Sequence, residues 1–472
     1  MDPISSLQLF IPELILLTGA FLTLILDLFI KNKRTVAMAA LIVLGITALS
    51  LETPEGSPSL FYGFFMLDRF THFFRCLALG IVGLTILASL RYHEKLESAE
   101  GEYYSLFLLM AFGLISMGAA SNLLMIFLAI EFVSLLSYLL VGFLKESPHS
   151  KEAAIKYLLF GSLASGIMLY GMSLLYGITG SLELSAIHRS ILNPEFSPIA
   201  LAAILLMFAG LGFKISMAPF HMWAPDVYQA APTPVTGFLT VGPKALGFAV
   251  LIRVLTSAFY DIDWQWSVLI TVLSILTMTI GNIVAIAQTN IKRLLAYSSI
   301  AQAGYILMGI AVFQKTGLTA ILIYLLAYAF TNLGAFIAVI MASNHFKDDY
   351  LESYQGLARR SPVLAASMTI FLLSLAGIPP LAGFIGKFFV FSAAIEAKMI
   401  TLAVAAALNS AVAAYYYFKV IRIMYLVEPT EWDQGPLPQP VSLKIALGLT
   451  LAGTVLIGLF PAPFITWIQG IF

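Results

Sequence analysis

Cysteine is almost missing from this sequence of 472 residues. With only Cys76 present, an internal disulfide is excluded, and without any C-x-x-C pair a cysteine-ligated zinc or iron–sulfur site is not expected. The six histidines also lack metal-ligand spacing. Redox chemistry coupled to this chain is therefore expected in partner proteins.

Charged residues are also scarce: they make up 11% of the sequence, against roughly a quarter in soluble domains. The 25 basic residues balance the 25 acidic ones, so no net field exists to hold a nucleic acid. Asp2, Pro12 and Glu13 stand where a cleavable signal would carry a basic N-terminal region, so no signal peptide is expected. With 60% hydrophobic residues, the composition indicates an integral membrane protein.

Motifs of soluble enzymes are missing as well. Gly237–Lys244 has the spacing of a phosphate loop, but Pro243 precedes the lysine and no serine or threonine follows it. No nucleophile elbow is present, and the polar connections are too short for a nucleotide-binding domain.

What the sequence does contain is long apolar runs. A helix needs about 20 largely apolar residues to cross about 30 Å of hydrocarbon. The sequence predicts an all-α polytopic protein with about 14 transmembrane helices, near 7–30, 35–51, 69–90, 103–119, 121–144, 151–178, 199–230, 236–258, 264–288, 292–313, 318–343, 361–397, 399–426 and 441–465.

Basic residues predict the orientation, because they are enriched in cytoplasmic loops. With the N-terminus outside, 16 of the 25 fall on the cytoplasmic side and 6 on the other, which favours both termini on the non-cytoplasmic side. The 16 are Lys31, Lys33, Arg34, Arg91, Lys95, Lys145, Lys151, Lys156, Lys292, Arg293, Lys347, Arg359, Arg360, Lys419, Arg422 and Lys444.

Four ionisable residues well inside predicted spans need a physical reason: Glu131, Lys214, Lys244 and Lys387. Each charge at the bilayer centre costs about 2.5–3.5 kcal/mol, so such residues usually face a bundle interior or a hydrated cavity. The alternatives are that Lys244 reaches an interface and that Glu131 only locks two helices by an ion pair. His221 is interpreted as a packing residue, with a relay role as the alternative.

Two of the lysines lie in helices that the sequence predicts to be broken. Glycines and prolines surround Lys214, and Pro379-Pro380 precedes Lys387. Helices 4–8 and 9–13 thus form two five-helix blocks, each with a broken fourth helix, and the odd number makes the repeat inverted. The predicted divisions are 1–102, 103–258, 259–426 and 427–472.

Uncharged polar residues at helical spacing accompany these charges. Ser298, Gln302 and Tyr305 share one span, and Tyr324, Tyr328 and Asn332 share the next. Such side chains hold water between titratable groups, which favours a proton wire.

The sequence resembles the antiporter-like membrane subunits of respiratory complex I, the proton-pumping NADH:quinone oxidoreductase. It is most similar to subunit N, the counterpart of mitochondrial subunit 2. The resemblance covers essentially the whole chain and rests on APFHMWAPDVYQAAPTPVTGFLTVGPKALGF at 218–248, LAGIPPLAGFIGKFFVF at 375–391 and IEFVSLLSYLLVG at 130–142.

The resemblance implies a proton-translocating subunit of a redox-driven complex. Glu131 then corresponds to the helix-five glutamate paired with the helix-seven lysine, Lys214, while Lys244 and Lys387 correspond to the connecting and terminal lysines. Lys156 is a further candidate near the cytoplasmic end.

It also implies that the chain itself carries no cofactor, whereas NADH, flavin, iron–sulfur clusters and quinone belong to partner subunits. Partners are then other membrane subunits, including neighbouring antiporter-like ones, in an energy-coupling membrane, most simply the bacterial inner membrane. The alternatives are a subunit of a multisubunit cation/proton antiporter and a purely structural membrane anchor.

Overall fold

A computed structural model gives the structure of residues 3–54, 56–90, 92, 100–191, 197–346, 348–428, 437 and 439–472. Arg91, Lys95 and Lys347, which enter the orientation prediction, lie outside the described residues.

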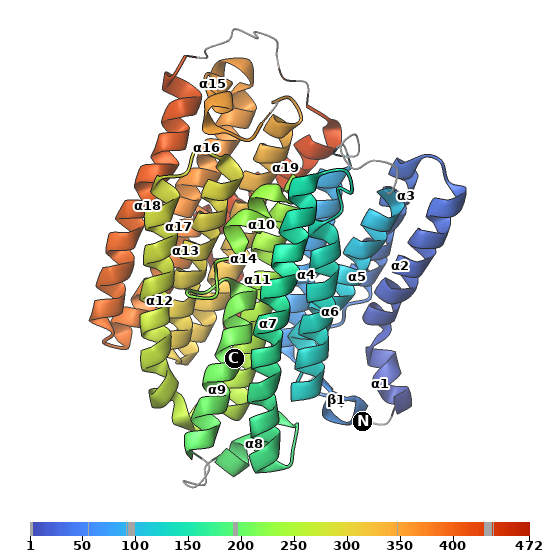
Figure 1. The fold of residues 1–472 in the computed structure, drawn as a ribbon, viewed down its shortest axis with the longest axis vertical. Coiled ribbons are helices and arrows are strands. Elements are labelled where there is room, and N and C mark those ends of the chain that lie inside the picture. The colour runs from blue at the N-terminus through green and yellow to red at the C-terminus, as the bar shows by residue number, and fades with distance from the viewer. Residues whose placement is uncertain are drawn as a thin grey trace.

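The described chain is a bundle of helices with one two-stranded antiparallel sheet (Figure 1). Its first half consists of α1 (Pro3–Leu9), α2 (Ile11–Phe29), α3 (Lys33–Leu49), β1 (Ser59–Leu60), η1 (Phe61–Gly63), β2 (Phe65–Met66), α4 (Arg69–Ser89), α5 (Glu100–Ala119), α6 (Leu123–Val141), α7 (Pro148–Thr179), α8 (Leu184–Ile191), α9 (Ser197–Ile215), α10 (Ala224–Ala230) and α11 (Thr233–Ala258). The second half consists of η4 (Tyr260–Ile262), α12 (Asp263–Ile286), α13 (Ile291–Val312), α14 (Lys315–Ser343), η5 (Leu351–Tyr354), α15 (Leu357–Arg360), α16 (Pro362–Ala376), α17 (Ala382–Glu396), α18 (Ile400–Leu426), α19 (Val441–Leu459) and α20 (Ala462–Gln469).

Each of the fourteen predicted spans coincides with a helix or a broken pair of helices. Twelve helices among the described residues are long and apolar enough to cross a membrane. The other two spans are α3, which has 17 residues, and the pair α16 and α17, which have 15 residues each. The fold class predicted from the sequence is thus confirmed.

Both predicted breaks are present. Between α9 and α10 the chain leaves the helix over residues 216–223, and between α16 and α17 over residues 377–381. In contrast, α11 continues through Pro243, so the segment that resembles a phosphate loop is helical.

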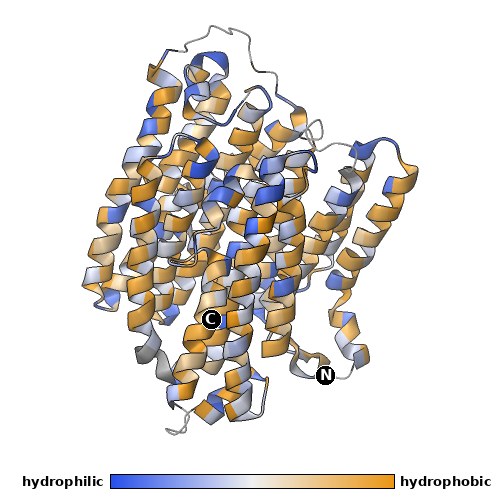
Figure 2. Ribbon diagram, viewed as in Figure 1, coloured by the Kyte–Doolittle hydropathy of each residue, from blue (hydrophilic) through white to orange (hydrophobic). Residues whose placement is uncertain are grey.

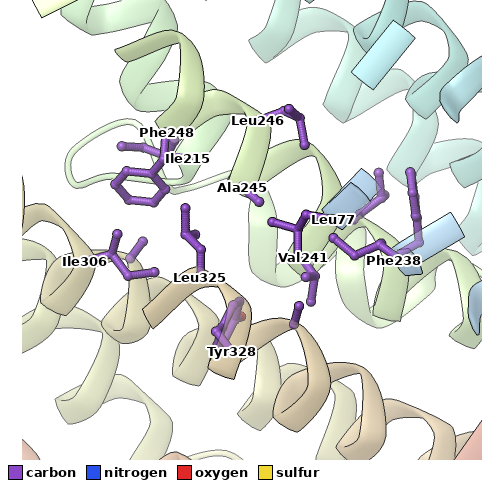
Figure 3. Packing of buried hydrophobic residues seen from close by; sticks show 14 of the residues in the cluster. Leu77, Ile215, Phe238, Val241, Ala245, Leu246, Phe248, Ile306, Leu325 and Tyr328 are labelled. Carbon is purple, nitrogen blue, oxygen red and sulfur yellow. The ribbon is translucent and has the colours of Figure 1, made fainter. Parts of the chain in front are cut away.

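The centre of the bundle is formed by α11, α13 and α14, whose side chains are almost all buried. Figure 3 shows apolar side chains from α4, α9, α11, α13 and α14 meeting around α11. A helix that is apolar on all sides needs neighbours on all sides, which explains why these three lie innermost.

The peripheral helices instead expose apolar side chains. Leu28, Phe29 and Leu49 on α2 and α3, and Leu408 and Leu426 on α18, are more than half exposed. In Figure 2 the outer helices are largely orange along their length, and blue residues gather near the ends of the bundle. Contact with lipid tails accounts for this surface, since exposure to hydrocarbon has no hydrophobic cost.

The two ends of the chain lie at one end of the bundle. The backbone N–H of Phe61 donates to Ser6 Oγ at 3.1 Å, and Arg69 donates to the carbonyl of Gly470 at 2.8 Å. Because residues 59–69 form one connected segment, both termini meet the same face, as an even number of crossings requires.

Candidate functional site

The first buried lysine, Lys214, lies in the last turn of α9. It is 2% exposed and donates a hydrogen bond to Ser134 Oγ on α6 at 3.0 Å. Glu131, one turn earlier on α6, accepts a hydrogen bond from Ser165 Oγ on α7. In the described part of the chain no ion pair of 4.0 Å or less joins Glu131 to Lys214. The carboxylate and the ammonium therefore lie near each other on α6 and α9 but have different partners.

The second, Lys244, follows a proline within α11. Pro243 has no N–H for the carbonyl of Leu239, and the Tyr228 hydroxyl donates to that carbonyl at 3.3 Å. Lys244 donates to Ser299 Oγ on α13 at 2.8 Å and to the Ser299 carbonyl at 3.2 Å. Its ammonium lies 5.6 Å from the centroid of the Tyr228 ring, within cation–π range. It is buried, so the predicted alternative of reaching an interface does not apply in this structure.

The third, Lys387, extends toward the break between α16 and α17. Its ammonium donates to the carbonyl of Ala376, the last residue of α16, at 3.0 Å and to Ser410 Oγ on α18 at 3.2 Å. The same ammonium lies 4.5 Å from the centroid of the Tyr305 ring. The free carbonyls at a helix C-terminus carry partial negative charge, so this end of α16 favours a cation.

Polar side chains fill the space between α13, α14 and α18. Gln302 Oε1 accepts from the Tyr324 hydroxyl at 2.5 Å, and Gln302 Nε2 donates to Tyr417 Oη at 3.3 Å and to the Leu375 carbonyl at 3.1 Å. Tyr417 in turn shares a hydrogen bond of 2.6 Å with Ser298. All five residues that contribute these polar groups are buried.

This network approaches two lysines at once. Ser298 precedes the serine that binds Lys244, and Leu375 precedes the carbonyl that binds Lys387. Beside it is a cavity with ≈ 10 Å³ for the centre of a water molecule, which is about what one water requires. Its lining is Gln302, Tyr324, Ala327, Tyr328, Thr331, Ser374, Leu375 and Gly383.

Tyr328 and Asn332 on α14 both bind Thr240, one turn before Lys244. The Tyr328 hydroxyl donates to the Thr240 carbonyl at 3.2 Å, and Asn332 Nδ2 donates to Thr240 Oγ1 at 2.8 Å. Thr233 also lies on α11, seven residues before Thr240 and hence on the same face.

A polar cavity of ≈ 860 Å³ reaches Thr233 at the N-terminal end of α11. Lys156 is part of its wall, with 41% of the side chain exposed, and pairs with Glu152 at 2.8 Å and Asp226 at 3.3 Å. Arg293 binds the other oxygen of Asp226 at 2.7 Å. Lys156 therefore lies at the mouth of a cavity and outside the row of buried lysines.

His221 lies in the non-helical segment between α9 and α10. It is 8% exposed, and its Nδ1 has no hydrogen-bond partner within the described ranges. No hydrogen bond in the described structure joins it to a lysine, so the relay role has no contact to support it.

The partners of the charged groups were missed by the sequence reasoning. Ser165, Ser299 and Ser410 are serines on other helices, and a serine in an apolar helix is too common to stand out. A usable signal did exist for two of them, since Ser298-Ser299 and Asn409-Ser410 are adjacent polar pairs within otherwise apolar spans.

Among the described residues, no group of three or more histidine, cysteine, aspartate or glutamate side chains is placed to hold a metal ion. The arrangement consists instead of ammonium groups held by hydroxyls, carbonyls and aromatic rings, which is suited to holding and passing protons.

Comparison with known proteins gives the family to which the chain is related. The family described as NADH:quinone oxidoreductase/Mrp antiporter, TM, matches residues 120–413. NADH-quinone oxidoreductase subunit N of Dehalococcoides mccartyi is 41% identical over 480 residues, which cover 98% of each chain.

Solved structures share the fold. A chain of respiratory complex I from Thermus thermophilus with bound aureothin matches with a TM-score of 0.81 and 33% identity, covering 96% of this chain and 98% of that one. A chain of the Mrp complex from Dietzia sp. DQ12-45-1b matches with a TM-score of 0.83 at 22% identity, covering 99% and 97%, and shows the fold alone. On its sequence identity over nearly the full length, the chain belongs to the family of NADH-quinone oxidoreductase subunit N, an antiporter-like membrane subunit.

Proposed function

We propose that this chain translocates protons as a membrane subunit of a redox-driven quinone oxidoreductase, through Glu131, Lys214, Lys244 and Lys387. The observation that carries the proposal is the set of three lysines, each 5% exposed or less, with no carboxylate within ion-pair distance in the described structure. A purely structural cation would gain most from a carboxylate partner, whereas a proton carrier must be able to become neutral.

The first step concerns Glu131 and Lys214. An ionised carboxylate that approaches Lys214 stabilises the protonated ammonium, and a carboxylate held away by Ser165 leaves the proton free to move on. One charge crossing 100 mV is worth about 2.3 kcal/mol. The movement of Glu131 has to change the free energy of the proton on Lys214 by about this amount.

The onward route runs from Lys244 to Lys387. Ser299 and Ser298 are adjacent, and the Ser298–Tyr417–Gln302 hydrogen bonds lead toward the break that holds Lys387. The small cavity beside Gln302 supplies a place for a bridging water. Tyr328 and Asn332 act from the other side by fixing Thr240 next to Lys244.

Electron transfer belongs to other subunits in this proposal. NADH, flavin, iron–sulfur clusters and quinone are assigned to partners, and the chain assembles with neighbouring membrane subunits in the bacterial inner membrane. The distribution of basic residues supports both termini on the non-cytoplasmic face, an orientation in which the ≈ 860 Å³ cavity opens to the cytoplasm. The divisions at 102, 258 and 426 remain our proposed boundaries of the two inverted blocks.

A second candidate function is cation/proton exchange without redox turnover, as in a multisubunit antiporter. The shared fold with the Mrp chain favours it only at the level of architecture. Sodium-driven proton movement by the assembled complex in the absence of NADH and quinone would support this alternative.

Reconstituted vesicles test the main proposal. The complex with Lys244→Ala should acidify vesicles much less per NADH oxidised than the wild type, because the connecting proton carrier is gone. Lys145→Ala is the matched control, since Lys145 is an exposed lysine outside the spans. Equal pumping by both variants would contradict the proposal.

A further inference from the structure

The two halves of α11 differ sharply on either side of Lys244. Toward the N-terminal end, Thr240 and Thr233 continue the polar face to the large cavity. Toward the C-terminal end, residues 245–252 read ALGFAVLI and are all buried, and none has a polar side chain. Along α11, water and hydrogen-bonding groups thus approach Lys244 from only one side of the membrane.

The opposite face of the protein has its own water-accessible depression. A cavity of ≈ 610 Å³ is lined by residues of the 59–66 segment, by residues 183–185 and by Ser257 of α11. Ser257 lies one turn beyond Arg253. Arg253 therefore stands between this depression and the apolar stretch that leads to Lys244.

Arg253 is buried and firmly held. Its side chain is 7% exposed and binds both carboxylate oxygens of Asp68, at 2.5 and 3.1 Å. It also donates to Thr71 Oγ1 at 2.9 Å, and its guanidinium lies 4.8 Å from the ring centroid of Phe70. These contacts fix the cation against the start of α4.

Asp68 lies just before α4, outside the membrane-spanning helices, and its carboxylate is kept ionised. Burial alone would raise the pKa of Asp68, but the hydrogen bonds and positive charge of Arg253, together with the Thr71 amide, outweigh it and lower that pKa. The Asp68 side chain is the more exposed partner, at 19% against 7%. The pair is thus a dipole with its cation toward the interior.

We propose that Arg253 is an electrostatic seal, which prevents protons on Lys244 from leaving through the C-terminal end of α11. The seal rests on the proposed proton translocation. A guanidinium cannot give up its proton near neutral pH, so it repels an arriving proton and cannot relay one. It lies nine residues from Lys244, about 13 Å along the helix. Protons on Lys244 are thereby directed sideways to α13.

Passive proton permeability is the property that tests this seal. The assembled complex is reconstituted in vesicles without NADH or quinone, a potassium diffusion potential is imposed with valinomycin, and internal pH is followed with a dye. Arg253→Gln should raise the proton flux by about tenfold or more, the lower end of the effect of local charge on ion encounter rates. Arg253→Lys should leak less than Arg253→Gln but more than the wild type, because lysine keeps the charge but can release its proton.

Two further variants separate a seal from a structural clamp. Asp68→Asn breaks the same ion pair but leaves the cation, so it should not leak, whereas a clamp predicts equal leakage from both variants. Arg69→Gln removes an exposed arginine next to Asp68 and should change nothing. Leakage by Asp68→Asn equal to that of Arg253→Gln would overturn the proposal.

Arg253→His provides a test if Arg253→Gln does not assemble. This variant should leak less near about pH 6 than near about pH 9, because the imidazole loses its charge as the pH rises, while the wild type shows no such step. A flat pH response in assembled Arg253→His would refute the seal.

The double variant Lys244→Ala/Arg253→Gln distinguishes the seal from the proposed function. If the leak passes through Lys244, the double variant is tight again. A leak that persists would overturn the seal while leaving pumping through the lysines untouched. Loss of redox-driven pumping is measured separately with Lys244→Ala alone.

Discussion

The two broken helices place the same residue type in two different surroundings. Lys214, on α9, precedes its break and is held by the side chain of Ser134 on α6. Glu131 lies one turn from Ser134 on α6. Lys387 follows its break and is held by the backbone carbonyl of Ala376 at the end of α16 in addition to the Ser410 side chain. A side chain can exchange partners, whereas a helix terminus is fixed. We infer that the first lysine is the adjustable one and the second is a fixed station.

The breaks also differ in how the chain turns. At the second, Gly377 has φ +90°, and a Cβ there would lie 2.7 Å from Cδ of Lys387. At the first, Ser216 adopts φ +58° despite its side chain. The second break thus needs a glycine to leave room for its lysine, while the first does not.

Substitution of Lys387 should give the largest effect. Lys387→Ala should lower pumping by about 100-fold, as expected for loss of a positioned proton-transfer group, and Lys387→Arg should be almost as damaging because arginine keeps its proton. The measurement is proton uptake in reconstituted vesicles. Near-normal pumping by the arginine variant would show that a fixed cation suffices at this position.

Changes at the first break should also lower pumping strongly, but by less than the changes at Lys387. Lys214→Ala or Glu131→Ala should lower pumping and coupled quinone reduction while the complex still assembles. Native gels give the amount of assembled complex, and turnover is then expressed per complex. Lost assembly with normal specific activity would mean that these residues lock helices together and would remove the distinction between an adjustable and a fixed lysine.

Gly377→Ala should have a smaller effect, because the flexible Lys387 side chain can shift at a cost of about 0.5–1.5 kcal/mol. Pumping should fall a few-fold. The matched control is Gly180→Ala, which also has a positive φ, +64°, but has no atom within 4 Å of its Cβ. The control should lose a similar amount of thermal stability and keep its pumping; equal pumping by the two variants would argue against close packing at the second break.

Cysteine labelling tests on which side of the membrane the ≈ 860 Å³ cavity opens. The substitutions that this experiment needs should leave activity unchanged. After Cys76 is replaced by alanine, Arg359→Cys should react with an impermeant maleimide only from the cytoplasmic side, since its side chain is 65% exposed. Labelling from the other side would reverse the orientation of the whole bundle and of both breaks.

Much of the fold could be predicted because it depends on one-dimensional properties. Bilayer thickness sets the length of an apolar run, which is why fourteen spans were found even though α3 is short and α16 and α17 are separate. Glycine and proline near Lys214 and Lys387 predicted both breaks. The ion pair expected between Glu131 and Lys214 was not found, since serines compete for both groups and their positions depend on α6, α7 and α9 together.

The sequence by itself determined that Lys214, Lys244 and Lys387 are buried, because a lysine amid twenty apolar residues has no route to water except through the protein interior. The burial of Glu13, Arg75, Arg253 and Lys292 was not among the predictions, because it depends on helix packing. Only the tertiary structure decided what each charge touches. Ser299, Ser410 and the carbonyl of Ala376 come from other helices or from the far side of a break, and their distances to Lys244 and Lys387 depend on how helices pack. Helical periodicity places residues on a face, but the neighbour of that face is set by packing of the whole bundle.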